Sequence, residues 1–432
     1  MDVWKRNLAV LWLAQFLVMA AMNQIMPFLP FLLTRELGLS DARDVHVWTG
    51  LIFGVNFLPA LLVAPLWGNL ADRYGRKLMI LRSGFGMAIA NGLMGFVQTP
   101  EQLLLLRFLN GMISGFIPAS IALVSTNTPR ERVGTALGVL QSGGVAGTIL
   151  GPALGGLLAD RIGFRALFWV TGGALLFATL IVLFFVRETN RPSPAARPAG
   201  GGFRRDAARI LSTRPLPALF ASSLFVQFAL VALMPVLALY TETLLGREEG
   251  AAFWAGVVMG MTGVANMLAS PLLGRLADRF GGERVLVGSL VAGSAFMFLH
   301  ALVGNVGGLM VARFLFGLAA GGLMPSINAL IREKAPAGME SRTYGLANSA
   351  TFFGNMVGPI VGGAVSGLFG MRAVFVFSGA VLLADAALAW REIVPAYRRK
   401  AAPPPADRGE APAAVKPPAG FGATAPRRPS ER

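Results

Sequence analysis

The sequence predicts an all-α membrane protein, with twelve transmembrane helices arranged as two pseudo-symmetric six-helix bundles. The first observation is compositional: 54% of the 432 residues are hydrophobic and only 14% are charged, whereas about a quarter of the residues of a soluble domain are charged. The second is a series of apolar runs that reach the length of about 20 residues needed to cross a bilayer. The third is an internal repeat that relates the two halves of the chain.

The apolar runs follow one another with short polar stretches between them, which gives the positions of the helices. Hydropathy predicts helices at residues 8–33, 46–67, 78–98, 102–124, 134–158, 166–186, 216–240, 252–273, 285–303, 308–331, 343–368 and 372–390.

The distribution of basic residues predicts the orientation of these helices. With the N-terminus inside, six of the 38 Lys and Arg residues fall in outer loops, Arg107 and Arg313 fall within helices, and the others gather on the inner side. The positive-inside rule therefore predicts an even number of helices and two cytoplasmic termini. We place this multi-pass chain in the cytoplasmic (inner) membrane of a bacterium.

Two polar stretches divide the chain. Residues 187–215 are rich in Pro, Gly and Arg and predict a cytoplasmic linker between an N-terminal bundle, residues 1–186, and a C-terminal bundle, residues 216–390. Residues 391–432 are rich in Pro and Ala with dispersed charges, which predicts a disordered cytoplasmic tail.

The repeat is carried by three motifs that keep their spacing. The run GNLADRYGRK at 68–77 returns 206 residues later as GRLADRFGGE at 274–283, and RFLNGMISG at 107–115 returns at the same offset as RFLFGLAAG at 313–321. The run GTILGPALGG at 147–156 returns one residue further on as GNMVGPIVGG at 354–363. Such a repeat is typical of secondary transporters, in which two bundles rock around a central site.

These motifs resemble those of the major facilitator superfamily. The run at 68–77 resembles its motif A, Arg107 with Gly111 resembles motif B, and the run at 147–156 resembles motif C of its drug:H⁺ antiporters. The run PFLP at 27–30 resembles the proline pair of the twelve-helix drug antiporter branch, a group that includes bacterial multidrug resistance transporters. The resemblance covers about residues 4–392 and implies the fold of that superfamily.

The motif A loops predict a cytoplasmic latch between the bundles. We expect Asp72 to pair with Arg342 at the start of the eleventh helix, and Asp278 to pair with Arg132 at the start of the fifth. An alternative is that these turns only connect the helices and set their orientation in the membrane. The latch residues are Gly68, Asp72, Arg73, Gly75, Arg76, Gly274, Asp278, Arg279, Arg132 and Arg342.

Small residues in the fifth helix predict a close contact with another helix, because glycines near i, i+4 and i+8 form a smooth stripe. We expect this seam to meet the other bundle and to seal or flex during transport; tight packing alone is the alternative. Its residues are Gly143, Gly147, Gly151, Pro152, Gly155 and Gly156.

Charged residues inside predicted helices are candidates for coupling, because a charge in the membrane is costly unless it faces protein or water. Arg107 is expected to face the cavity, and in the antiporters that it resembles this arginine is associated with proton coupling. Arg313 is its repeat, and Asp385 is the one acid well within a predicted helix. The first six helices offer no evident embedded carboxylate as a proton carrier.

Polar and Met residues on helices expected to face the centre predict a soft, apolar substrate cavity with a few placed polar groups. The alternative for each is packing between helices or against lipid. The candidates are Met22, Asn23, Met26, Asn110, Gln227, Met234, Asn328, Asn348 and Asn355.

Together these features predict a secondary active transporter that exports drugs or other amphipathic small molecules by proton antiport and alternating access. The sequence lacks the GxxxxGK[ST], HExxH and GxSxG motifs and any cysteine, so we expect no enzyme activity, cofactor or metal site. The expected partners are a small-molecule substrate, H⁺ and the lipid bilayer, without nucleic acid or an obligate protein partner. A permease for a sugar or organic anion, or a sensor that does not transport, is the alternative.

Overall fold

The computed structural model describes residues 2–129, 132–189, 203–336 and 339–398, and within these ranges all regular secondary structure is helical. The N-terminal half contains α1 (Val3–Ile25), η1 (Met26–Phe28), α2 (Leu29–Phe31), η2 (Leu32–Glu36), α3 (Ala42–Val55), α4 (Phe57–Tyr74), α5 (Arg76–Met94), α6 (Pro100–Ile113), α7 (Phe116–Asn127), α8 (Val133–Ile162) and α9 (Phe164–Phe185).

The second half of the chain repeats this order after one short helix. It contains α10 (Phe203–Ser212), α11 (Leu216–Val231), α12 (Met234–Leu245), α13 (Ala251–Phe280), α14 (Gly282–Leu302), α15 (Val306–Ala320), α16 (Leu323–Lys334), α17 (Glu340–Phe369), α18 (Met371–Leu388), η4 (Ala389–Ile393) and α19 (Val394–Arg398). We call α1–α9 the N-terminal half and α11–α19 the C-terminal half.

Eleven helical segments among the described residues are long and apolar enough to span a membrane. The predicted third helix is the remaining one: it forms α5, which is 19 residues long and carries Lys77 and Arg82. It packs between α6, α7 and α9 of the N-terminal half. The all-helical fold predicted from hydropathy is thus confirmed.

Several spans are bent where the sequence breaks the helical pattern. Pro27 and Pro30 mark the change from α1 through the short η1 turn into α2, since proline lacks the N–H that continues a helix. Gly115 separates α6 from α7 and has φ +138°, a conformation that favours glycine.

Each half has its own buried core. One cluster runs from Leu11 to Val186 and lies within the N-terminal half, and another runs from Ile210 to Tyr397 and belongs to α10 and the C-terminal half. A third cluster joins the halves, because it combines residues such as Phe28 and Phe53 with Ala238 and Ala252.

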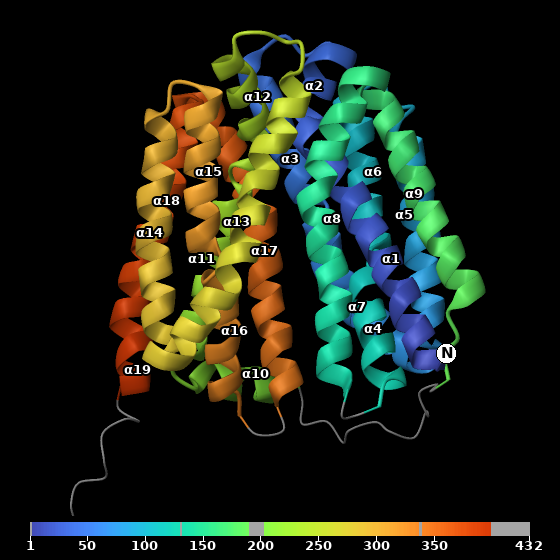
Figure 1. Cartoon of the computed structure of the whole chain (residues 1–432), viewed down its shortest axis with the longest axis vertical. Helices are drawn as coiled ribbons and strands as arrows, with labels where there is room; N and C mark the ends of the chain where they lie inside the picture. Colours follow the sequence, from blue (N-terminus) through green and yellow to red (C-terminus); the bar gives the residue numbers. More distant parts are fainter. Residues whose placement is uncertain (1, 130–131, 190–202, 337–338, 399–432) are drawn as a thin grey trace, which may run out of the picture.

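The two halves meet at one end of the molecule. The start of α1 and the end of α19 lie on opposite sides of the same end of the molecule, which we call the terminal end (Figure 1). The joining cluster lies at the opposite, distal end, and in Figure 1 the two groups of helices spread apart from there toward the terminal end.

Two stretches differ from their sequence predictions. The second part of the predicted linker forms α10, a helix that was not among those predicted, and its Ile210 is fully buried. Residues 391–398 continue the last helix instead of starting a disordered tail, because Tyr397 Oη donates to the Leu330 carbonyl at 2.6 Å. Residues 190–202 of the linker and 399–432 of the tail lie outside the described residues.

Candidate functional site

Two helix pairs connect the halves, and glycines set how closely they approach. A Cβ at Gly156 of α8 would lie 2.4 Å from the Ala252 carbonyl oxygen of α13, and one at Gly256 of α13 would lie 2.2 Å from that of Pro152. The second pair repeats this arrangement: a Cβ at Gly50 of α3 would lie 2.3 Å from the Pro359 carbonyl oxygen of α17. Only residues without a side chain allow these backbones to touch.

The glycine seam predicted in the fifth helix therefore has two faces. Gly156 and Pro152 meet the other half as expected, but Gly143, Gly147, Gly151 and Gly155 face α1 of their own half. The prediction that the whole seam meets the other bundle is wrong for these four glycines. Glycine spacing in the sequence predicts a smooth helix face, but it does not predict which neighbouring helix packs against that face.

Polar contacts reinforce the connection at the distal end. Arg35 of η2 forms an ion pair with Glu242 of α12 and lies 3.5 Å from Glu248. The Phe253 backbone N–H at the start of α13 donates to Asp160 Oδ2 of α8 at 3.1 Å. Both contacts join the two halves, and sequence analysis missed them because each acid resembles an ordinary loop residue.

The latch residues lie at the terminal end, and the described ones are not paired as predicted. Arg342 forms an ion pair with Asp206 of α10. The Arg132 guanidinium lies 5.9 Å from the ring centre of Trp4, and neither Arg132 nor Asp278 makes an ion pair within the described ranges. The side chain of Asp72 lies outside the described residues. The halves are spread apart at this end, so there is no interface there for ion pairs between them.

The motif A turn is held by an acid that the sequence analysis did not single out. Glu188, just after α9, accepts from the backbone N–H groups of Arg76 at 2.9 Å and Lys77 at 3.1 Å, at the start of α5. Gly75 has φ +100°, and a Cβ there would lie 2.8 Å from Glu188 Oε2. Gly68 and Gly274 have open space around them, and Arg73 and Arg279 are exposed.

Arg107 is buried inside the N-terminal half instead of facing a central cavity. Only 1% of the residue is exposed, and its Nε and Nη2 have no hydrogen-bond partner among the described residues. Its guanidinium lies 5.9 Å from the ring centre of Phe168 on α9. This buried cation therefore has no counter-ion among the residues that the structure describes.

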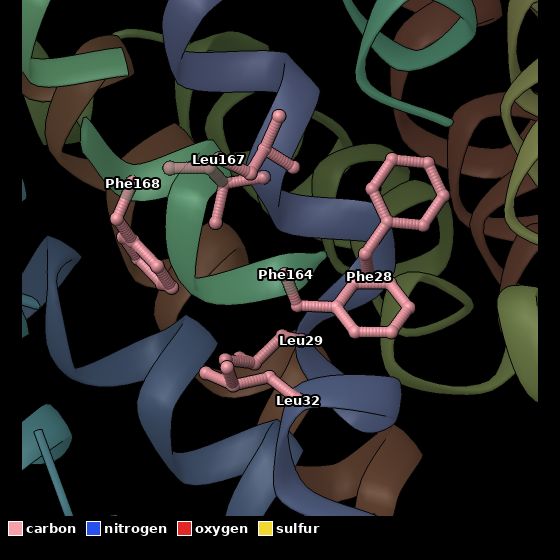
Figure 2. A pocket seen from close by; sticks show the side chains of 7 residues that line it. Phe28, Leu29, Leu32, Phe164, Leu167 and Phe168 are labelled. Atoms are coloured by element: carbon pink, nitrogen blue, oxygen red, sulfur yellow. The ribbon is translucent and has the colours of Figure 1, made fainter. Parts of the chain in front are cut away.

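Phe168 also lines a small apolar gap of about 10 Å³ between the segment α1–η2 and α9. Figure 2 shows its lining side chains, Phe28, Leu29 and Leu32 from the bent end of the first span and Phe164, Leu167 and Phe168 from α9. The gap is too small for a drug-sized molecule, since such sites usually measure several hundred Å³.

Asn110 belongs to a buried chain of amides, not to an open surface. Its Nδ2 donates to Asn56 Oδ1 at 3.0 Å, and Asn91 Nδ2 donates to its Oδ1 at 3.2 Å. Asn56 and Asn91 were not predicted, because single amides within apolar helices carry no distinctive pattern.

Arg313 and Asp385 are both buried in the C-terminal half. The Nε of Arg313 has no partner among the described residues, and the residue is 3% exposed. Asp385 Oδ1 accepts from Ser222 Oγ of α11 at 2.6 Å, while Oδ2 has no partner there. Buried polar groups without partners are unusual in folded proteins.

The remaining cavity candidates are divided between partly buried and exposed positions. Met22, Asn23, Met26, Gln227, Met234 and Asn355 are partly buried, and Asn328 and Asn348 are exposed. Asn23 Nδ2 donates to the Met19 carbonyl at 2.8 Å, and Met234 packs against both the joining cluster and the C-terminal core.

The sequence comparisons identify the family. The sequence model of the Major Facilitator Superfamily matches residues 11–268 and again residues 248–428. The chain belongs to the Major Facilitator Superfamily. As a member of this superfamily it is a multi-pass membrane transporter for small substrates and not an enzyme.

Curated relatives within the superfamily match almost the whole chain. The multidrug resistance protein MdtG of Citrobacter koseri is 40% identical over 390 residues, which are 90% of this chain and 95% of that protein. MdtG of Salmonella typhimurium is 39% identical over the same share of this chain and 96% of its own length.

Solved structures of other transporters share the fold. The nucleoside transporter NupG aligns with a TM-score of 0.72 over 91% of this chain and 100% of its own, at 14% sequence identity. A bacterial homologue of the lysosomal transporter Spinster, described as inward-facing and occupied, aligns with a TM-score of 0.75 over 90% and 97%, at 16% identity. The fold prediction is therefore confirmed.

Proposed function

We propose that this chain is a secondary active exporter that moves drugs or other amphipathic small molecules out of the cell in exchange for protons. The likeness to MdtG proteins, named for multidrug resistance, supports the substrate class. The family supports the transport mode, and the basic inner loops support a bacterial inner-membrane location with both termini in the cytoplasm.

The observation that carries the mechanism is that the halves touch at the distal end. With the termini in the cytoplasm, the described conformation is closed outside and open inside. Alternating access then requires the Gly156–Ala252 and Gly50–Pro359 contacts to separate while the terminal end closes.

The moving bodies in this proposal are residues 1–186 and 216–390, connected by residues 187–215. Separate buried cores support this division, because each body keeps its own apolar contacts when the joining cluster separates. The latch is the counterpart of the distal contacts: Asp72–Arg342 and Asp278–Arg132 form when the cytoplasmic end closes.

Substrate binding falls to the partly buried groups between the bodies, with Asn23, Gln227 and Asn355 as polar contacts among Met22, Met26 and Met234. Arg107 couples proton movement to the cycle, with Arg313 as its counterpart and Asp385 as the candidate acid. A cation buried without a counter-ion is sensitive to any charge that enters its surroundings.

Drug flux into sealed proteoliposomes with an imposed pH gradient tests this function. The wild-type protein should accumulate drug only when the gradient is present, and Arg107→Ala should reduce the rate at least about tenfold, as loss of about 1.4 kcal/mol of coupling would do. Flux that follows the drug gradient alone and ignores the imposed pH difference would contradict proton antiport.

A further inference from the structure

Equivalent sites between the helices differ in the two halves. Side chains fill the site in the N-terminal half, and the corresponding site in the C-terminal half is a groove. In the N-terminal half, the Arg82 guanidinium of α5 lies 3.4 Å from the ring centre of Trp67 on α4. Trp67 Nε1 donates to the Met112 carbonyl at 2.8 Å, and Arg82 Nη2 donates to the Ile113 carbonyl at 3.1 Å. An indole and a guanidinium thus fill the space between α4, α5 and α6.

The repeat offset of 206 residues gives the equivalent positions in the C-terminal half. Leu273 stands in the place of Trp67, and Gly288 stands in the place of Arg82. The register is consistent with the structure, because Gly86 lies against Ile113 and their repeat partners, Ala292 and Ala319, line one groove together. Both bulky side chains that fill the first site are missing from the second.

The result is a groove of about 310 Å³ between α13, α14 and α15, which lie side by side in the C-terminal half (Figure 1). Its walls are apolar apart from Arg284 and Ser289, and its rim includes Leu276 and Phe280, which are 47% and 48% exposed. The remaining lining residues are Leu273, Val285, Gly288, Ala292, Leu318 and Ala319.

The groove does not open toward the other half. Gly256 and Gly263 mark the face of α13 that meets α8, because added Cβ atoms there would touch Pro152 and Ile149. At about 100° per residue, Leu273, Leu276 and Phe280 lie between about 80° and 160° around the helix from those two glycines. The three helices are membrane-spanning segments, so this flank faces lipid.

A cation stands at the mouth of the groove. Arg284, in the first turn of α14, is exposed and makes no ion pair with a described residue. Its repeat partner is Leu78, so Arg284 lies one helical turn nearer the start of α14 than Gly288, the position equivalent to Arg82. Arg279 is a second exposed cation nearby, and Glu283 is the adjacent acid.

We propose that this groove binds one acidic phospholipid of the leaflet at the terminal end. One acyl chain occupies the space that Trp67 and Arg82 fill in the other half, and the headgroup phosphate pairs with Arg284. An apolar channel at membrane depth that ends at a cation beside the headgroup layer matches a phospholipid in both shape and charge.

Photo-crosslinking in nanodiscs tests the proposal with the full-length protein. The discs contain phosphatidylethanolamine and a minority of phosphatidylglycerol that carries a diazirine in one acyl chain, and labelled peptides are identified by mass spectrometry. The wild-type protein should be labelled selectively on α13, α14 and α15, and not on the equivalent faces of α4, α5 and α6.

Two variants separate the acyl-chain and headgroup contributions. The double variant Leu273→Trp with Gly288→Arg rebuilds the filled site and should reduce labelling in the groove about tenfold, since the chain loses its apolar contacts. Leu272→Trp, on the neighbouring 61% exposed position, is the matched control and should leave labelling unchanged. Arg284→Gln should abolish the preference for phosphatidylglycerol over a phosphatidylcholine with the same diazirine chain.

Three outcomes would overturn the proposal. Labelling of the groove that persists in the filled variant would show that the acyl chain lies elsewhere. Equal labelling by the two lipids in the wild-type protein would remove the headgroup assignment. Labelling by a photoreactive drug analogue in place of lipid would make the groove a drug site. Arg284→Gln alters one exposed side chain, so its result stands even where the double variant is unstable.

Discussion

At the scale of single residues, this transporter keeps several polar groups inside the membrane without full hydrogen bonding. Arg107, Arg313 and Asp385 each have a buried atom with no partner among the described residues. The sequence analysis recognised Arg107, Arg313 and Asp385 as charges within helices, because a charged residue in an apolar run is easily recognised, but it counted Arg82 of α5 among the inner residues. It could not predict their partners: Ser222 lies 163 positions from Asp385, and serines are common in these helices.

The hydrogen bond between Ser222 and Asp385 gives a prediction about stability. Asp385→Asn keeps an acceptor for the Ser222 hydroxyl, so the free energy of unfolding should stay within about 1 kcal/mol of wild type. Asp385→Ala leaves that hydroxyl buried and unpaired, and should cost about 1–3 kcal/mol. Thermal unfolding of both variants in detergent measures this. Equal stability of the Ala and Asn variants would mean that the hydrogen bond contributes nothing.

The ion pair between Arg35 and Glu242 gives a prediction about the distal end. Because this pair joins the halves only while that end is closed, Glu242→Gln should raise the outward-open fraction about twofold to fivefold, as loss of a partly exposed pair worth up to about 1 kcal/mol implies. The chain has no cysteine, so two introduced cysteines carry spin labels at chosen sites and report the distance across the distal end.

A matched pair at the same end serves as the control. Glu36 Oε2 lies 3.1 Å from Arg165 Nε with similar exposure, but both residues belong to the N-terminal half. Glu36→Gln should therefore leave the distance distribution unchanged. If it widened the distal end as much as Glu242→Gln does, loss of charge in general would explain both results.

At the scale of helices, the two contacts between halves depend on glycine positions that periodicity alone predicts incompletely. Spacing of i, i+4 and i+8 correctly indicated a smooth face on α8. The structure uses Gly155 and Gly156, adjacent in sequence, against different partners: Gln24 of α1 in the same half and Ala252 of α13 in the other. Adjacent residues point about 100° apart on a helix, so Gly155 and Gly156 belong to two different faces of α8.

Substitution by valine should have different consequences at these two adjacent glycines. A Cβ at Gly156 overlaps α13 only when the distal end is closed, so Gly156→Val should shift the population toward outward-open protein by about 1–3 kcal/mol, the usual cost of overpacking. A Cβ at Gly155 would lie 2.2 Å from the Gln24 carbonyl oxygen within one half. Gly155→Val should therefore lower the unfolding temperature in either conformation.

The control for this pair is Gly138→Ala, also on α8, where nothing lies within 4 Å of an added Cβ. It should change neither the distance distribution nor the unfolding temperature by more than the small gain expected of alanine in a helix. Loss of stability in Gly156→Val without any conformational shift would argue that its contact with α13 persists throughout the cycle.

At the scale of the whole molecule, hydropathy and the repeat were sufficient to predict the fold. Each predicted helix corresponds to a described helical segment because a run of apolar residues in lipid has to satisfy its backbone within itself. The conformational state was not predictable, since one sequence must stabilise both the inward-open and the outward-open arrangement. Helix α10 was missed for a different reason: its surroundings are rich in Pro and Gly, and it is stabilised by contacts of Ile210 and Asp206 with the C-terminal half.

That helix leads to a prediction about the state equilibrium. Arg342 pairs with Asp206 in the conformation described, and the proposed latch assigns the same guanidinium to Asp72 when the cytoplasmic end closes. If the two carboxylates compete for one cation, Asp206→Asn should raise the closed fraction and Asp72→Asn should lower it. Because 41% of the Arg342 side chain is exposed, each shift should be at most about fivefold, corresponding to about 1 kcal/mol.

Spin labels at the start of α8 and the end of α13 measure this opening directly. Asp2→Asn is a suitable control, because Asp2 pairs with Lys5 at 3.1 Å within one helix at the same end of the molecule. Opposite shifts for the two test variants, with no change in the control, are expected only of competing partners. Shifts in the same direction would contradict competition, and the exchange of Arg342 between partners would then be excluded.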